Sequence, residues 1–176
     1  MRRALVLAFT ISALVIARSA ATTGAQSIHA APATAPSTGR LAPPGEPGRP
    51  LTVSGLVLDA KGAPVSHASL YVYQTDREGY YGVKPASDSG NPRLKLFLRS
   101  DAKGAWSFDT VKPGSYPGSR NPAHIHFEVS ATGHANRFFE IVFEEDPFIT
   151  DQMRTNPAFS VRPIDGTRVT ERIVLK

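Results

Sequence analysis

From Leu51 onward the chain consists of short runs of β-branched and aromatic residues separated by turn sequences. No stretch carries a convincing helical period, so the runs predict strands. They lie at residues 52–58, 69–74, 94–99, 105–109, 124–130, 138–143 and 169–175. The sequence Asp-Ala-Lys-Gly supplies a turn at 59–62 and again at 101–104. This pattern predicts an all-β fold, an antiparallel β-sandwich with long functional loops at 79–92 and 144–166.

The first 25 residues have the pattern of a secretory signal peptide. Arg2 and Arg3 precede an apolar run at 4–16, and small residues follow. A membrane anchor is the alternative, but the run is shorter than the roughly 20 residues needed to cross a bilayer, and Arg18 ends it. Cleavage after 19–21 or after 23–25 fits equally. We therefore expect a periplasmic or secreted protein with no transmembrane span after processing.

Residues 26–50 are rich in Ala, Pro, Gly, Ser and Thr and contain almost no large apolar side chain. Such a segment buries too little surface to offset its ordering entropy, which predicts a flexible arm. The arm is also a candidate contact between copies of the chain in a homo-oligomer. The folded domain is then expected at 51–176.

The formal net charge of +5 falls to about +2 when Arg2, Arg3 and Arg18 leave with the leader. The other basic residues are interspersed with Asp and Glu, so no nucleic-acid partner is expected. An exported protein is free to form disulfides, but the sequence has no cysteine. Stability must therefore come from the core, from a metal or from association.

Two histidines, His124 and His126, lie one residue apart in a predicted strand. Side chains alternate along a strand, so both project from one face, about 7 Å apart at the backbone, while Ile125 and Phe127 point into the core. A half-buried polar face is the plain alternative to a metal pair. A cupin site is excluded by spacing, because Ser130 or Ala131 occupies the place of the required glutamate.

Tyr116 lies eight residues before His124, in a turn bracketed by Pro-Gly pairs at 113–114 and 117–118. Two imidazoles leave most of a coordination sphere empty, and no cysteine is present to fill it. A phenol is a poor ligand for a divalent ion, but a strongly Lewis-acidic ferric ion can hold it as phenolate. A packed turn aromatic remains the alternative for Tyr116.

Three stretches together, GLVLDAKGAPVSHASLYVYQTDREGYY, SDAKGAWSFDTVKPGSYP and NPAHIHF, resemble the intradiol ring-cleavage dioxygenases, the family of protocatechuate and catechol dioxygenases. The resemblance covers about 51–147 and implies the family's β-sandwich and its non-haem Fe(III). The ligands that it implies are Tyr81, Tyr116, His124 and His126, with Tyr80 as the alternative to Tyr81 if the register slips by one.

The resemblance also implies an activity. A catechol-type substrate and O2 would meet at the ferric ion, and the ring would open between its two hydroxylated carbons to give a muconate-type diacid. Tyr116 matches the ligand that swings away when substrate arrives and accepts one of its protons.

The sequence departs from the family at the residues around this site. Asn121 stands where the family has a catalytic arginine, and Arg120 is one residue away. Glu140 stands where relatives carry a neutral polar residue near the site, with an exposed strand carboxylate as the alternative. An acidic wall would disfavour protocatechuate and favour simple catechols or hydroxyquinol-like rings. Two other functions stay open, a transthyretin-like binding module and an iron-binding homologue with weak catalysis.

Overall fold

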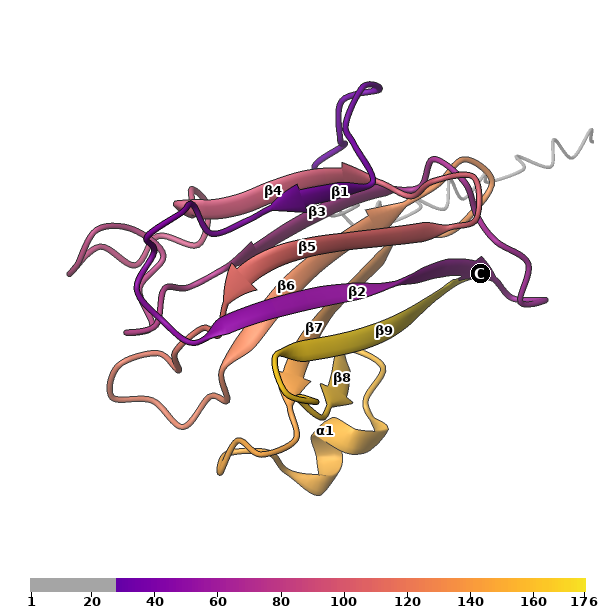
Figure 1. Cartoon of the computed structure of the whole chain (residues 1–176). Coiled ribbons are helices and arrows are strands. Elements are labelled where there is room, and N and C mark those ends of the chain that lie inside the picture. Colours follow the sequence, from indigo (N-terminus) through magenta and orange to yellow (C-terminus); the bar gives the residue numbers. More distant parts are fainter. Residues whose placement is uncertain (1–27) are drawn as a thin grey trace, which may run out of the picture.

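The computed structural model describes residues 28–176, which form a sandwich of two sheets (Figure 1). The expected signal peptide lies outside these residues. One sheet has the order β1-β5-β2-β9 and the other the order β4-β3-β6-β7-β8. The strands are β1 (Thr38–Arg40), β2 (Pro50–Asp59), β3 (Ser69–Gln74), β4 (Leu94–Arg99), β5 (Ala105–Val111), β6 (His124–Ser130), β7 (Arg137–Phe143), β8 (Phe159–Arg162) and β9 (Arg168–Leu175).

All seven predicted runs form strands, so the all-β sandwich is confirmed. The antiparallel detail holds only in part, because β1 pairs in parallel with β5, β2 with β9, and β7 with β8. The core lies between the two sheets. In β6, for example, Ile125, Phe127 and Val129 are at most 1% exposed and point inward.

The segment before β2 corrects the prediction of a flexible arm at 26–50. Residues 28–50 pack along the domain, and Ala31, Leu41 and Ala42 are buried. Hydrogen bonds to its main chain compensate for the small number of large side chains, because β1 pairs with β5 and the Arg99 guanidinium donates to the carbonyls of Ala31 and Pro32. A few buried apolar residues and hydrogen bonds to the rest of the domain thus hold this segment against the domain surface.

The predicted loop at 144–166 contains two further elements, the helix α1 (Asp151–Thr155) and the strand β8. Thr150 caps the helix, and its hydroxyl accepts a hydrogen bond from the Met153 amide. Within the part of the chain described here, no helix is long and apolar enough to cross a membrane.

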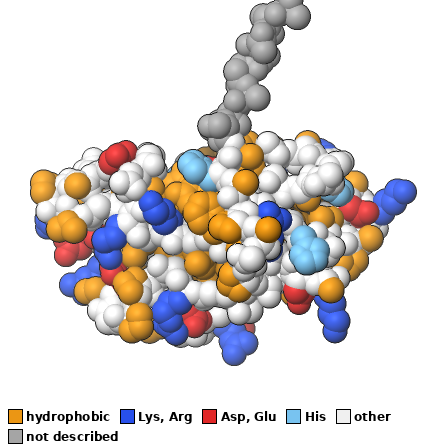
Figure 2. Space-filling model, turned by 90° about the horizontal axis from the view of Figure 1, so that it is seen from above, with side chains coloured by type: hydrophobic (Ala, Val, Ile, Leu, Met, Phe, Trp, Pro, Cys, Tyr) orange, Lys and Arg blue, Asp and Glu red, His pale blue; other side chains and the backbone are white. Residues whose placement is uncertain are grey.

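The outer face of the five-stranded sheet carries the polar residues of interest. Cross-strand partners share a face, and the register places His126 beside Tyr73 of β3 and Glu140 of β7. Loops at 75–93 and 112–123 adjoin this face. Charges of both signs are interspersed over the surface seen in Figure 2, without a single basic field.

Candidate metal centre

The two histidines of β6 form the base of the site. His124 is 6% exposed, and its Nε2 lies 3.0 Å from the Nε2 of His126. Nδ1 of His124 donates to the Pro122 carbonyl at 2.7 Å, because a carbonyl oxygen can only accept. In the neutral tautomer that this bond selects, the unprotonated Nε2 of His124 faces the centre of the group.

Two phenols complete the group from two different loops. The Tyr81 hydroxyl lies 2.5 Å from the Tyr116 hydroxyl and 2.6 Å from Nε2 of His126. The Tyr116 hydroxyl lies 2.8 Å from Nε2 of His124. The structure thus brings all four residues expected as ligands together. Tyr80 is the neighbour left outside, since its ring lies beneath the Lys84 ammonium at 5.6 Å.

The electrostatics of the group favour neutral side chains. Burial is the largest cause that raises the pKa of Tyr81 and of Tyr116 above the usual value for a phenol. Burial, with a smaller contribution from His124, lowers the pKa of His126 to about 3. The two phenols and the His126 ring are therefore favoured in their neutral forms, and a positive ion would be needed to make the phenolates stable.

The donor set fits a Lewis-acidic cation. Two phenol oxygens and two imidazole nitrogens converge within hydrogen-bond distances of one another. Nitrogen lone pairs 3.0 Å apart repel unless a proton or a cation lies between them. Oxygen and nitrogen donors of this kind suit iron, and phenolate ligation favours its trivalent form.

A second grouping, of His124, His126 and Glu140, has ligand atoms within 4.8 Å of one another. Oε1 of Glu140, however, lies 3.3 Å from Nδ1 of His126, while Nε2 of the same ring faces the phenols. Glu140 therefore stands behind His126, where it can orient the ring as an outer carboxylate. Burial raises the pKa of Glu140. Glu140 therefore differs from both predictions made for it, an acidic wall of the substrate pocket and an exposed strand carboxylate.

Arg120 and Asn121 do not join the group. Both residues are exposed, and the Arg120 guanidinium lies 5.8 Å from the centre of the Phe148 ring. The backbone amide of Asn121 donates to the hydroxyl of Ser119. Among the described residues, no hydrogen bond joins either side chain to the two tyrosines or the two histidines.

A hollow of about 410 Å³ borders the phenol side of the group. Its lining residues are Tyr80, Tyr81, Ser87, Ser89, Tyr116 and Pro117. The volume is in the range that holds small ligands, and none of these six side chains is acidic or basic in the way of Asp, Glu, Lys or Arg. A smaller hollow of about 220 Å³ lies on the other side of His126, where Glu140 is part of the lining.

Sequence reasoning missed the contact that Tyr73 makes. Its ring stacks on His126 with the centroids 4.3 Å apart and an interplanar angle of 11°. Burial raises the pKa of Tyr73 to about 12, so the ring acts as a neutral packing surface for the imidazole. The alternation in 69–74 carries the signal, because it places Tyr73 on the same outer face as His126.

Comparison with known proteins gives one consistent result. Residues 23–164 match the family model described as Dioxygenase. Hydroxyquinol 1,2-dioxygenase from Rhodococcus opacus is 33% identical over 119 residues, which cover 58% of this chain and 39% of that protein. The protocatechuate 3,4-dioxygenase beta chain from Burkholderia cepacia is 33% identical over 117 residues, which cover 60% of this chain and 49% of that protein. The matched region thus spans less than half the length of these curated relatives.

A solved structure resembles most of the chain. It is the dioxygenase domain of a dioxygenase and carbohydrate-binding protein fusion from the cellulolytic bacterium Streptomyces sp. SirexAA-E. The TM-score is 0.61 and the identity 25%, over 82% of this chain and 93% of that domain. A sandwich of this size therefore occurs elsewhere as a separate domain.

Proposed function

Because the chain belongs to the intradiol ring-cleavage dioxygenase family, we propose that it is an exported, non-haem Fe(III) enzyme. Its substrates would be catechol-type diols and O2, and its products muconate-type diacids. One observation carries the proposal, the convergence of Tyr81, Tyr116, His124 and His126 through their phenol oxygens and Nε2 atoms. Ferric iron held by these four residues would supply the Lewis acidity that activates the ring.

The two tyrosines have different parts in this proposal. Tyr81 is 3% exposed, and its hydroxyl has hydrogen-bond partners on both sides. It would therefore stay in place as a metal ligand. Tyr116 is less buried, lies in a Pro-Gly turn and borders the hollow. Its phenolate oxygen is therefore positioned to accept a proton from a substrate hydroxyl and to move aside with it.

The lining of the hollow supports a preference among substrates. Ser87, Ser89 and the phenol of Tyr80 offer neutral hydrogen-bonding groups. Among the described residues, no lysine or arginine lines the hollow as a partner for a substrate carboxylate. We therefore expect catechol and hydroxyquinol to be better substrates than protocatechuate. This preference no longer depends on Glu140, which lies on the other side of His126.

The test uses the full chain loaded with ferric iron. Tyrosinate bound to ferric iron absorbs visible light, so the loaded protein should be coloured, and catechol added without oxygen should shift the band. Admission of oxygen should then give a muconate, followed by its ultraviolet absorbance and by mass spectrometry. The three diols compared at equal concentration test the preference. A colourless loaded protein would overturn the proposal.

A second candidate, an iron-binding homologue with slow turnover, is favoured by one observation. Arg120 lies over the Phe148 ring and Asn121 is exposed, so among residues 28–176 neither side chain is placed at the phenols to steady negative charge in a substrate ring. Coloured protein that shifts its band with catechol but releases no product would support this second candidate. Replacement of Asn121 by arginine would then be expected to raise turnover.

A further inference from the structure

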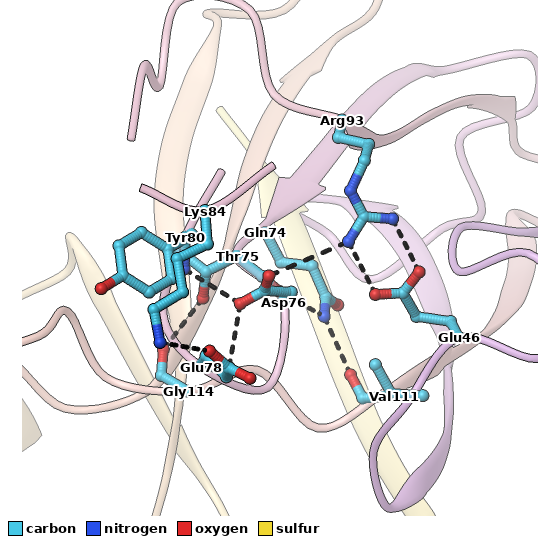
Figure 3. Close-up of polar contacts among 10 residues, drawn as sticks. All are labelled: Glu46, Gln74, Thr75, Asp76, Glu78, Tyr80, Lys84, Arg93, Val111 and Gly114. Carbon is cyan, nitrogen blue, oxygen red and sulfur yellow. Dashed lines mark hydrogen bonds and ion pairs between the residues drawn. The ribbon is translucent and has the colours of Figure 1, made fainter. Parts of the chain in front are cut away.

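The two tyrosines lie on irregular backbone, in contrast to the histidines of β6. Tyr81 belongs to the loop between β3 and β4, and Tyr116 to the link between β5 and β6. In the described part of the chain, neither tyrosine belongs to a strand, so no ladder of strand hydrogen bonds holds it in place. A polar network at the base of both loops, centred on Asp76, takes over this role (Figure 3).

Asp76 sets the course of the chain immediately before Tyr81. Its Oδ1 accepts hydrogen bonds from the amides of Glu78 at 2.9 Å and Tyr80 at 3.0 Å. Its own amide donates to the Tyr80 carbonyl at 2.9 Å. The carboxylate thus stabilises a turn whose last residue directly precedes Tyr81.

The same residue reaches the turn that carries Tyr116. The Gly114 amide donates to the Asp76 carbonyl at 2.8 Å, and the Thr75 hydroxyl donates to the Gly114 carbonyl at 2.9 Å. These two bonds fix the chain two residues before Tyr116. One short stretch, Thr75 and Asp76, therefore contacts both tyrosine-bearing loops.

Glycines allow the two loops to touch through their backbones. A Cβ on Gly79 would lie 2.0 Å from the Ser115 carbonyl oxygen, and one on Gly114 would lie 2.4 Å from that of Arg77. Neither position has room for a side chain, so a shift of one loop must be followed by the other. The tyrosine loops therefore behave as one unit.

Arg93 fastens the far end of the first loop. Its amide donates to the Tyr81 carbonyl at 2.7 Å, and its guanidinium donates to both carboxylate oxygens of Glu46 at 2.6 and 2.7 Å. The same guanidinium lies 3.9 Å from Oδ2 of Asp76. A bidentate ion pair of this kind fixes the orientation of the Arg93 side chain as well as its distance from Glu46. Residues 28–50 thus contribute Glu46 to the scaffold of the site.

We propose that Asp76 and Arg93 are positioning residues for the two tyrosine donors, acting through the loops and not through contact with substrate. This inference rests on the proposed ferric site. Loss of the Asp76 carboxylate should move the phenols relative to the histidines, which β6 holds independently. The effect should therefore appear in the tyrosinate absorption and in iron binding, beyond any loss of stability.

The experiment compares Asp76→Ala and Asp76→Asn in the full chain, titrated with ferric iron. Asp76→Ala should lower iron affinity roughly 10–100-fold, as removal of outer partners of metal ligands does, and should shift the visible band. Asp76→Asn should restore most of both, because its amide oxygen can accept from the same two backbone amides. The melting temperature of each iron-free variant gives the stability effect separately.

Arg162→Ala is the control for a structural effect alone. Arg162, at the end of β8, donates to the carboxylate of Glu171 in β9, and Glu171 is 1% exposed. Both residues lie outside the tyrosine loops. Its loss should lower the melting temperature and leave the visible band in place. If Asp76→Ala does not fold, Thr75→Val provides the test, since it removes only the hydroxyl that holds Gly114.

The outcomes separate the two proposals. A wild-type chain that stays colourless with ferric iron overturns the ferric site and, with it, the role of the network. A coloured wild type with unchanged band and affinity in Asp76→Ala, or in Thr75→Val if that variant must replace it, overturns the positioning role alone. Equal losses in Asp76→Asn and Asp76→Ala would also contradict it, because the shared acceptor would then not matter.

Discussion

The strand β6 and the loop at 75–93 both contribute to the candidate metal centre, but they are held by different forces. β6 pairs with β3 on one side and β7 on the other, and its inner residues are buried in the core. Within residues 28–176 the loop has no strand partner around Tyr81, and it depends on hydrogen bonds that the Asp76 carboxylate accepts and that the Arg93 amide donates. Hydrophobic packing thus fixes the histidines, and a polar network fixes the tyrosines.

The two kinds of support should respond differently to substitution. Apolar burial under the histidines contributes most to stability and tolerates little change in side-chain volume. Hydrogen bonds at a loop contribute about 1 kcal/mol each, but they specify direction. Changes beneath β6 should therefore affect stability first, and changes in the loop should affect the metal first.

The largest expected effect on the metal comes from a donor in the loop itself. Tyr81→Phe removes one of the two phenol oxygens from the group, so it should weaken and shift the visible absorption of the ferric protein, with a loss of affinity greater than the roughly 100-fold typical of outer partners. Absorption spectra during ferric titration measure both. Tyr80→Phe is the matched control, because that phenol lies outside the group. An unchanged band in Tyr81→Phe and a weakened, shifted band in Tyr80→Phe would reverse the assignment.

Substitution of a core residue on the inner face of β6 should mainly lower the free energy of unfolding. Phe127 is 1% exposed and packs against Trp106, Phe108 and Phe139, so Phe127→Ala should cost about 3–5 kcal/mol of unfolding free energy. The protein that remains folded should keep the wild-type visible band, since the histidines lie on the opposite face. Urea denaturation and absorption spectra test the two parts. Phe97→Ala, at a partly exposed position, should cost less.

The contact between the tyrosine loops can be broken at one glycine. Gly79→Ala places a methyl group against the Ser115 carbonyl at a residue with φ of 88°, and should cost about 2–4 kcal/mol from overpacking and left-handed strain. Gly62→Ala has almost the same φ, 85°, but nothing within 4 Å of the new methyl, so only the strain remains. Denaturation of both variants gives the difference. Equal losses would mean that the close approach of the loops is unimportant.

The same contrast determines what the sequence alone can reveal. The outer-face position of His124 and His126 follows from alternation along one strand, and Tyr116 is marked by its turn. The anchors Asp76, Arg93 and Glu46 lie far apart in the sequence, and only the folded chain brings them together. β1 and β8 were missed for a similar reason. Each is only three or four residues long, and each pairs in parallel with a strand distant in the sequence or separated by a helix.

The smallest effect is expected at the outermost anchor of the loop. The hydrogen bonds from Arg93 are the main cause that lowers the pKa of Glu46, so the pair stabilises the fold above the unfolded pKa of about 4.3 and less as pH falls through the lower folded value. Glu46→Gln should therefore cost about 1 kcal/mol at neutral pH, a modest amount because the Arg93 side chain is 35% exposed. The difference from wild type should begin to shrink as the medium is acidified below about pH 4.3, and it should approach zero only below the lowered folded pKa of Glu46, where the wild-type carboxyl is also neutral. Urea denaturation of the iron-free proteins over a pH series measures it, with Glu144→Gln in the exposed pair with Arg154 as a control that should show almost no change. A Glu46→Gln difference that stayed constant into acid would mean that the charge of this carboxylate does not hold the loop.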